Sequence, residues 1–306
     1  MRPIGPNSAS SACSRAMRAS RSARSTVSSG HARRRSTPSV SAERAPRAAP
    51  HRSSGTVPAL AGETAMRYHV YLEEDETGRC MAHVPDLAGC TATGPDRAAA
   101  LAALPAAIRA YLRWCGEHGE PLPTDEPVEV AVAEVVRGCR PWRRGGAHAL
   151  FSVDRAPLGD AELRAYLRRM SYARGDLLAL VRGLSPHTLD ASPPGLPSVR
   201  AVLAHLIETE AWYLSRLGQR IPAVYDGTDI VQRLVDSRAR AVEVILRLSP
   251  RQRDLVYVPT ENPSDNPEEG WTLRKVLRCC LEHELSHLQE LQARFSDSLP
   301  ERHELG

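Results

Sequence analysis

The sequence has few features of a secreted or membrane protein. Its seven cysteines include no C-x-x-C pair, which argues against a disulfide framework and a thiolate zinc knuckle. No apolar run approaches the roughly 18 residues that a membrane span requires, and the N-terminus lacks the hydrophobic core of a secretory signal. We therefore expect a soluble protein of the reducing cytoplasm that has no membrane partner.

A net positive charge is also missing outside the first 65 residues. The formal net charge is +4, but residues 1–65 contain eleven Arg and two Glu, a net charge of +9, so the remaining 241 residues carry −5. Lysine occurs once, as Lys275. The basic character therefore belongs to a tail, and we predict no nucleic-acid partner.

Large apolar side chains are almost missing from residues 1–65, which hold fourteen Ser among many Arg and Ala. Such a segment cannot bury enough apolar surface to offset the entropy of ordering it, so we predict a disordered region. Two origins stay open: an overextended start or dispensable tail, and an organelle-targeting peptide. We also expect a short tail at 297–306.

Residues 66–136 have the pattern of a small α+β domain. RYHVYLEED alternates with period two, GRCMAHVPDLAGCTATG predicts two short strands, and VEVAVAEVV alternates again. Before the last strand, DRAAALAALPAAIRAYLRWCGEHG has apolar residues at helical spacing. The order β-β-β-α-β predicts one helix packed on an antiparallel sheet.

The stretch HVPDLAGCTATGPDRAAALAALPAAIRAYL resembles the HicB-type antitoxin domain, in which a strand ends in a Pro-x-x-x-Gly-Cys turn before an Ala-rich helix. The resemblance implies a partial RNase H-like sheet that binds a small protein partner, a toxin ribonuclease. The DNA-binding element that full-length antitoxins usually append does not follow. Asp75, Asp86 and Asp96 do not repeat the acidic cluster of an active RNase H site, so we predict no nuclease activity.

The rest of the chain is predicted to be a linker and a helical domain. Residues 137–157 are basic, contain Gly and Pro and lack periodicity, as a linker does. Residues 158–296 predict an all-α up-down four-helix bundle, so the fold class is multi-domain. The four amphipathic segments are separated by Pro, Gly, Asp or Asn and lie at 159–184, 197–218, 227–248 and 271–295.

The sequence HELSH at 283–287 has the H-E-x-x-H pattern of zinc peptidases. On a helix, His283 and His287 lie one turn apart, so both imidazoles can reach one ion. A peptidase also needs a third ligand after the motif, but few residues follow His287, and the sixth is Ala293 rather than the histidine of the extended motif. The pattern therefore favours another kind of metal site.

A third histidine lies on the second predicted bundle helix, VRAVLAHLIETEAWYLSRL, where His205 is at the margin of an apolar stripe. If this helix faces the fourth, His205, His283 and His287 provide three imidazoles and leave coordination positions open, as in a catalytic metal site. Glu284 is a candidate general base, with an orienting or ion-pair role as the alternative. Cys280 is either a fourth ligand or an ordinary buried cysteine. A metal-free bundle with hydrogen-bonded core histidines is the alternative to the whole site.

The segments AHLIETEAWYL, GWTLRKVL and HELSH together resemble the DinB superfamily of four-helix metal proteins. The resemblance implies a divalent ion, Zn or Ni, bound by the three histidines, and a transferase for a low-molecular-weight thiol. Many members continue with Arg-Gly-Gln after the last histidine, whereas this chain has Leu288, Gln289 and Glu290, so residues at the mouth of the site are not carried over.

Two other functions stay open. A metal-dependent hydrolase would use the same three ligands. A non-enzymatic protein would bind its partner through the HicB-like sheet and use the bundle as a scaffold, which we expect to form a homodimer if the protein is oligomeric.

Overall fold

The computed structural model describes residues 66–120, 127–139, 149–221, 229–259 and 269–296. All of these described residues belong to one compact unit. The tails predicted at 1–65 and 297–306 lie outside the described residues, so those predictions stay open. Within the described ranges, no helix is both long and apolar enough to cross a membrane.

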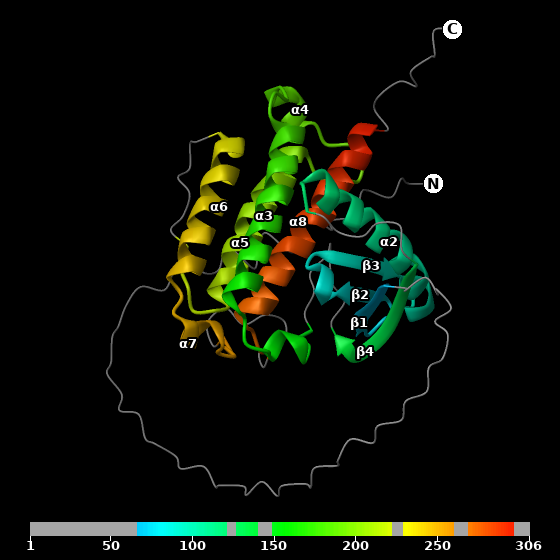
Figure 1. Ribbon diagram of the computed structural model, residues 1–306. Helices are drawn as coiled ribbons and strands as arrows, with labels where there is room; N and C mark the ends of the chain where they lie inside the picture. Colours follow the sequence, from blue (N-terminus) through cyan, green and yellow to red (C-terminus); the bar gives the residue numbers. More distant parts are fainter. Residues whose placement is uncertain (1–65, 121–126, 140–148, 222–228, 260–268, 297–306) are drawn as a thin grey trace, which may run out of the picture. The chain divides into compact units, whose positions relative to one another are not determined.

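The first part of the described chain is a four-stranded sheet with one long helix, α2 (Figure 1). The strands lie in the order β3-β2-β1-β4, in which β1 and β2 are antiparallel, β2 and β3 are antiparallel, and β1 and β4 are parallel. Their bounds are β1 Met66–Asp75, β2 Cys80–Val84, β3 Cys90–Gly94 and β4 Val128–Cys139.

The predicted order β-β-β-α-β is confirmed, but the predicted antiparallel sheet is wrong for β4. The reason is the helical crossover. Because α2 (Arg97–Glu117) connects β3 at one edge to β4 at the other, β4 returns in the same direction as β3 and β1.

Helix α2 covers one face of the sheet. It begins after Asp96, whose Oδ1 accepts a hydrogen bond from the Ala99 amide at 2.8 Å, a normal N-terminal cap. The helix packs on β2, β3 and β4. Its buried side chains recur at helical spacing, as the sequence predicts, and are Ala100, Leu104, Ile108, Tyr111, Leu112 and Cys115.

The second part is a bundle of four long helices, which confirms the predicted bundle (Figure 1). Helix α5 packs on α6 and α8, and α3 packs on α8 and α6. Consecutive helices α3 and α5 therefore lie across the bundle from each other, unlike the neighbouring pair of a simple up-down bundle. The long helices are α3 Asp160–Val181, α5 Val199–Ser215, α6 Ile230–Arg247 and α8 Leu273–Ser296, and the short ones are α4 Pro186–Asp190 and α7 Pro250–Arg253.

Helix α8 is buried on all sides over its first half, from Leu273 to Leu285. One side faces the bundle, and the other meets the second face of the sheet. The strand register places Tyr71, Glu73 and His83 on that face. There the His83 ring is fully buried, with Nδ1 3.0 Å from Glu282 Oε1. The sheet thus lies between α2 and α8.

The turn before β3 packs directly on α8. Gly89 has φ +100°, and a Cβ atom at this position would lie 2.8 Å from Leu281 Cγ and 2.9 Å from Leu285 Cδ1. Only a residue without a side chain allows this backbone conformation and this close approach.

Part of the predicted linker 137–157 is ordered. Its first residues extend β4, residues 140–148 lie outside the described ranges, and Ala149, Phe151 and Asp154 are buried. Asp154 accepts two hydrogen bonds from Arg278 on α8, Nη2–Oδ2 at 2.7 Å and Nε–Oδ1 at 3.1 Å. Because a buried carboxylate needs such a partner, this contact fixes the segment to the helix.

Candidate metal centre

The three predicted ligands lie on α5 and α8. Helix α5 begins after Ser198, whose Oγ accepts a hydrogen bond from the Ala201 amide at 3.2 Å, and His205 follows two turns later. Helix α8 supplies His283 and His287, which are one turn apart and therefore on one side of the helix. His205 is half-buried, and the other two are buried.

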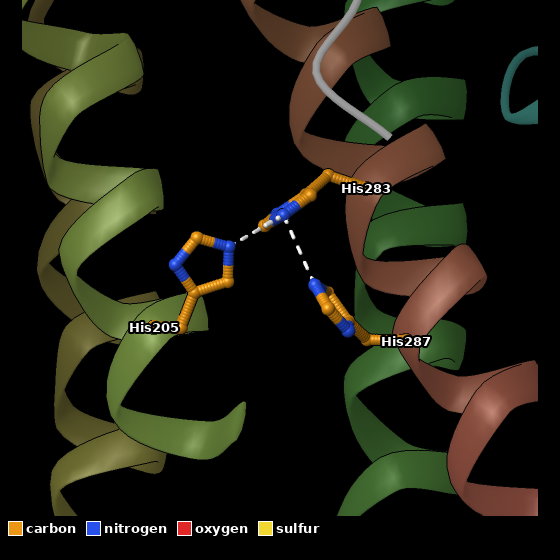
Figure 2. A group of neighbouring side chains, drawn as sticks. All are labelled: His205, His283 and His287. Carbon is orange, nitrogen blue, oxygen red and sulfur yellow. Dashed lines mark hydrogen bonds between the residues drawn. The ribbon is translucent and has the colours of Figure 1, made fainter. Parts of the chain in front are cut away.

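The Nε2 atoms of the three rings converge (Figure 2). His283 Nε2 lies 3.1 Å from His205 Nε2 and 3.2 Å from His287 Nε2, and one nitrogen from each ring lies within 4.8 Å of the others. Because a metal–nitrogen bond is about 2.1 Å long, nitrogen atoms this close together could bind the same ion. The three residues therefore fit a divalent metal ion, which their ring nitrogens would hold.

The outer ring nitrogens of two histidines face hydrogen-bonding partners. His287 Nδ1 lies 3.0 Å from Glu290 Oε2, and His205 Nδ1 lies 3.4 Å from Thr209 Oγ1. Because a carboxylate only accepts hydrogen bonds, the His287 proton is held on Nδ1, and its Nε2 lone pair points into the cluster.

Burial keeps the central histidine neutral. It lowers the pKa of His283 well below the ordinary value, and the nearby His287 and His205 lower it further. A neutral imidazole is the form that binds a metal ion. The position therefore has the protonation state that a ligand needs.

Two comparisons with known proteins identify the parts of the chain. A family model described as the DinB superfamily matches residues 169–291, which include all three histidines. The UPF0150 protein Ta0767 of Thermoplasma acidophilum is 37% identical over 67 residues, which are 22% of this chain and 97% of that protein. The chain belongs to the UPF0150 family, and its bundle is a DinB superfamily domain. The predicted HicB-like and DinB domains are both confirmed.

Two solved structures are also similar to the chain. YfiT from Bacillus subtilis, described as a probable metal-dependent hydrolase with an unusual four-helix bundle topology, is 18% identical with a TM-score of 0.35 over 45% of this chain and 90% of that one. The four-helix bundle protein TT2238 is 23% identical with a TM-score of 0.33 over 42% of this chain and 98% of that one.

Glu284 of the DinB domain lies in an ion-pair network beside the histidines. Its Oε1 accepts a hydrogen bond from Arg174 Nε on α3, and its Oε2 accepts one from Arg238 Nη2 on α6. Burial raises the pKa of Glu284, but the two arginines lower it more, so it falls below the ordinary value. The predicted general-base role of Glu284 stays a prediction without a supporting contact, since both oxygens are engaged by arginines.

The network extends to a second carboxylate. Arg238 Nε donates to Glu210 Oε1 at 2.5 Å, and Arg174 Nη2 lies 3.6 Å from Glu210 Oε2. Two arginines and two glutamates thus join all four long helices next to the histidines. The sequence analysis singled out Glu284, with an ion pair as one of its possible roles, but not its partners Arg174 and Arg238. The available signal was charge balance, because a buried carboxylate requires a cation from a facing helix.

Cys280 is buried in the same region, but the converging group among the described residues comprises the three histidines without it. Burial raises the pKa of the Cys280 thiol well above its ordinary value. Both facts fit an ordinary buried cysteine better than a thiolate ligand.

One cavity of the described residues lies apart from this centre. A cavity of about 670 Å³ lies between β3, α2 and α8 and is lined by residues such as Thr91, Ala110 and Gln289. None of the three histidines lines it. The chemistry of the histidines and this cavity are therefore separate features of the fold.

Proposed function

We propose that the DinB domain binds one divalent metal ion, Zn or Ni, through His205, His283 and His287, and that this centre serves an enzyme. The observation that carries the proposal is the convergence of three Nε2 atoms at distances that suit a single ion. Chance contact between core histidines would not require all three rings to present the same atom.

The proposed reaction is the transfer of a low-molecular-weight thiol to an electrophile. A sulfur–carbon bond forms, the leaving group departs with its electron pair, and the thiol proton passes to solvent. When bound, the metal would supply a Lewis acid that lowers the pKa of a thiol or a water molecule. This choice of reaction rests on the DinB resemblance, and hydrolysis is the alternative for the same ligands.

The residues of the chain have distinct tasks in this proposal. The three histidines hold the ion, and the half-buried side at His205 leaves access to it. The Glu210–Arg174–Glu284–Arg238 network fixes the helices around the site and keeps its charges compensated. We assign Glu284 to this network rather than to proton transfer.

For the non-enzymatic alternative, the sheet offers a partner less free surface than the sequence suggests. A protein partner of the HicB-like sheet would need an open surface, but α2 covers one face and α8 with Phe151 meets the other. Partner binding through this domain, and a homodimer through the bundle, stay predictions.

Elemental analysis of the purified, untagged protein tests the metal proposal. After incubation with zinc or nickel and removal of excess ion, the wild type should retain about one ion per chain, as a single site of three histidines requires. His205→Ala and His283→Ala should lose it, while His187→Ala, an exposed position on α4, should not. A wild type without a stoichiometric ion, or His283→Ala protein that keeps it, contradicts the proposal.

The reaction is tested separately with the metal-loaded protein. Glutathione or cysteine is mixed with a chloronitrobenzene electrophile, and thiol consumption is followed against the His283→Ala protein. Equal rates for the two proteins, across several thiols, would leave the metal site without this transferase activity.

A further inference from the structure

Glu290 has a position that the metal ligands alone do not explain. It follows His287 by three residues on α8, so its carboxylate can reach back to the ring, and its Oε2 lies 3.0 Å from Nδ1. The contact is on the far side of the imidazole from the Nε2 atom that faces the other histidines. Glu290 therefore acts on the cluster only through His287.

A second contact holds the carboxylate in place. Glu290 Oε1 accepts a hydrogen bond from Arg294 Nη2, and Arg294 Nη1 donates to the carbonyl of Pro197 at 2.8 Å. Pro197 immediately precedes the cap of α5, the helix that carries His205. The chain of contacts thus connects the two helices that supply the ligands.

The burial of these groups separates them from an ordinary surface pair. The side chain of His287 is 2% exposed, that of Glu290 is 34% exposed and that of Arg294 is 13% exposed. The pair Glu243–Arg247 on α6 has the same i,i+4 spacing as Glu290–Arg294. The side chains of Glu243 and Arg247 are 56% and 75% exposed. Of these two pairs, only Glu290–Arg294 contacts a histidine of the cluster.

We propose that Glu290 is a positioning residue of the metal centre, with Arg294 as its support. By accepting the Nδ1 proton of His287, the carboxylate fixes the tautomer and the rotation of the ring, so that Nε2 is presented to the ion, and it makes that nitrogen a stronger donor. This inference rests on the proposed metal-binding function and assigns a role within it to a residue that the sequence resemblance left out.

Metal affinity provides the test. Apo protein is titrated with zinc in competition with a chromophoric chelator, for the wild type, Glu290→Ala, Glu290→Gln and Glu243→Ala. We expect Glu290→Ala to raise the zinc Kd about 10- to 100-fold, as removal of a carboxylate behind a metal-bound histidine usually does. Glu290→Gln keeps a neutral acceptor and should recover part of this loss, while Glu243→Ala should match the wild type.

The thermal stability of the apo proteins separates positioning from a structural role. The Tm values of Glu290→Ala and Glu243→Ala should lie within a few degrees of each other, because each variant loses one partly exposed ion pair. Unchanged zinc affinity of Glu290→Ala overturns the inference, and so does a loss of affinity that accompanies unfolding and is not recovered by Glu290→Gln. A wild type that binds no zinc or nickel overturns the proposed function itself, which is a different result.

Discussion

Replacing Arg278 by alanine tests how strongly the buried ion pairs of α8 stabilise the fold. The side chain is 1% exposed, and it donates to Asp154 at 2.7 and 3.1 Å, to the Ala149 carbonyl at 3.0 Å and to Glu282 at 3.3 Å. Alanine would leave the carboxylates of Asp154 and Glu282 buried without this cation. It would also remove the donor that ties the segment before α3 to α8.

The magnitude follows from the burial. Removing one partner of a buried ion pair costs about 3–5 kcal/mol, because the remaining charge is uncompensated. In a compact unit of the size that the described residues form, 1 kcal/mol corresponds to roughly 2–4 °C in Tm, so we expect the Tm to fall by roughly 6–20 °C.

Thermal and urea unfolding of the full chain provide the measurement, with Arg247→Ala as the matched control. Arg247 pairs with Glu243 at 75% and 56% side-chain exposure, and loss of such a pair should cost only about 0.3–0.5 kcal/mol. If Arg278→Ala lowers Tm no more than Arg247→Ala, the buried network does not stabilise the fold and the reasoning is refuted.

Two further predictions concern the contacts of α8 with the sheet domain. Burial lowers the pKa of His83, but the Glu282 charge and the hydrogen bonds to Glu282 and Glu73 together raise it more, so the net shift is upward. The stabilisation from this shift is complete below the unfolded pKa of about 6.5 and is lost as pH rises through the folded value. Urea unfolding between pH 6 and 9 should show this loss in the wild type and not in His83→Gln. In urea unfolding, Gly89→Ala should lower the free energy of unfolding by about 1–3 kcal/mol more than Gly78→Ala. Both glycines have positive φ, but only the added methyl group at Gly89 would contact Leu281. Equal losses in the two variants would contradict the close packing of Gly89 on α8.

Local patterns were enough to predict the elements. Period-two alternation marked β1 and β4, and apolar residues three and four apart marked α3, α5, α6 and α8, since side-chain direction depends only on local backbone geometry. The direction of β4 and the diagonal placement of α3 and α5 were missed. Both depend on where a connection crosses the molecule, and a connection leaves no periodic signal.

The burial of α8 also could not be predicted fully from local patterns. The amphipathic pattern of 271–295 predicted one buried side, and Leu277 and Leu288 are buried. The opposite side carries Arg278 and Glu282, which resemble solvent-exposed residues in the sequence but are 1% and 4% exposed. Their partners Asp154 and His83 lie 124 and 199 residues away in the chain. No spacing rule connects such distant positions.

By itself, the sequence determined that His283 and His287 share one side of a helix, because four residues make about one turn. Only the tertiary structure decided that His205, 78 residues before His283, meets them through its Nε2 atom. It also decided that Glu284 turns to two arginines while Glu290 contacts a ligand. The physical reason is that helical spacing fixes which residues can act together, whereas the packing of facing helices fixes which atoms they present.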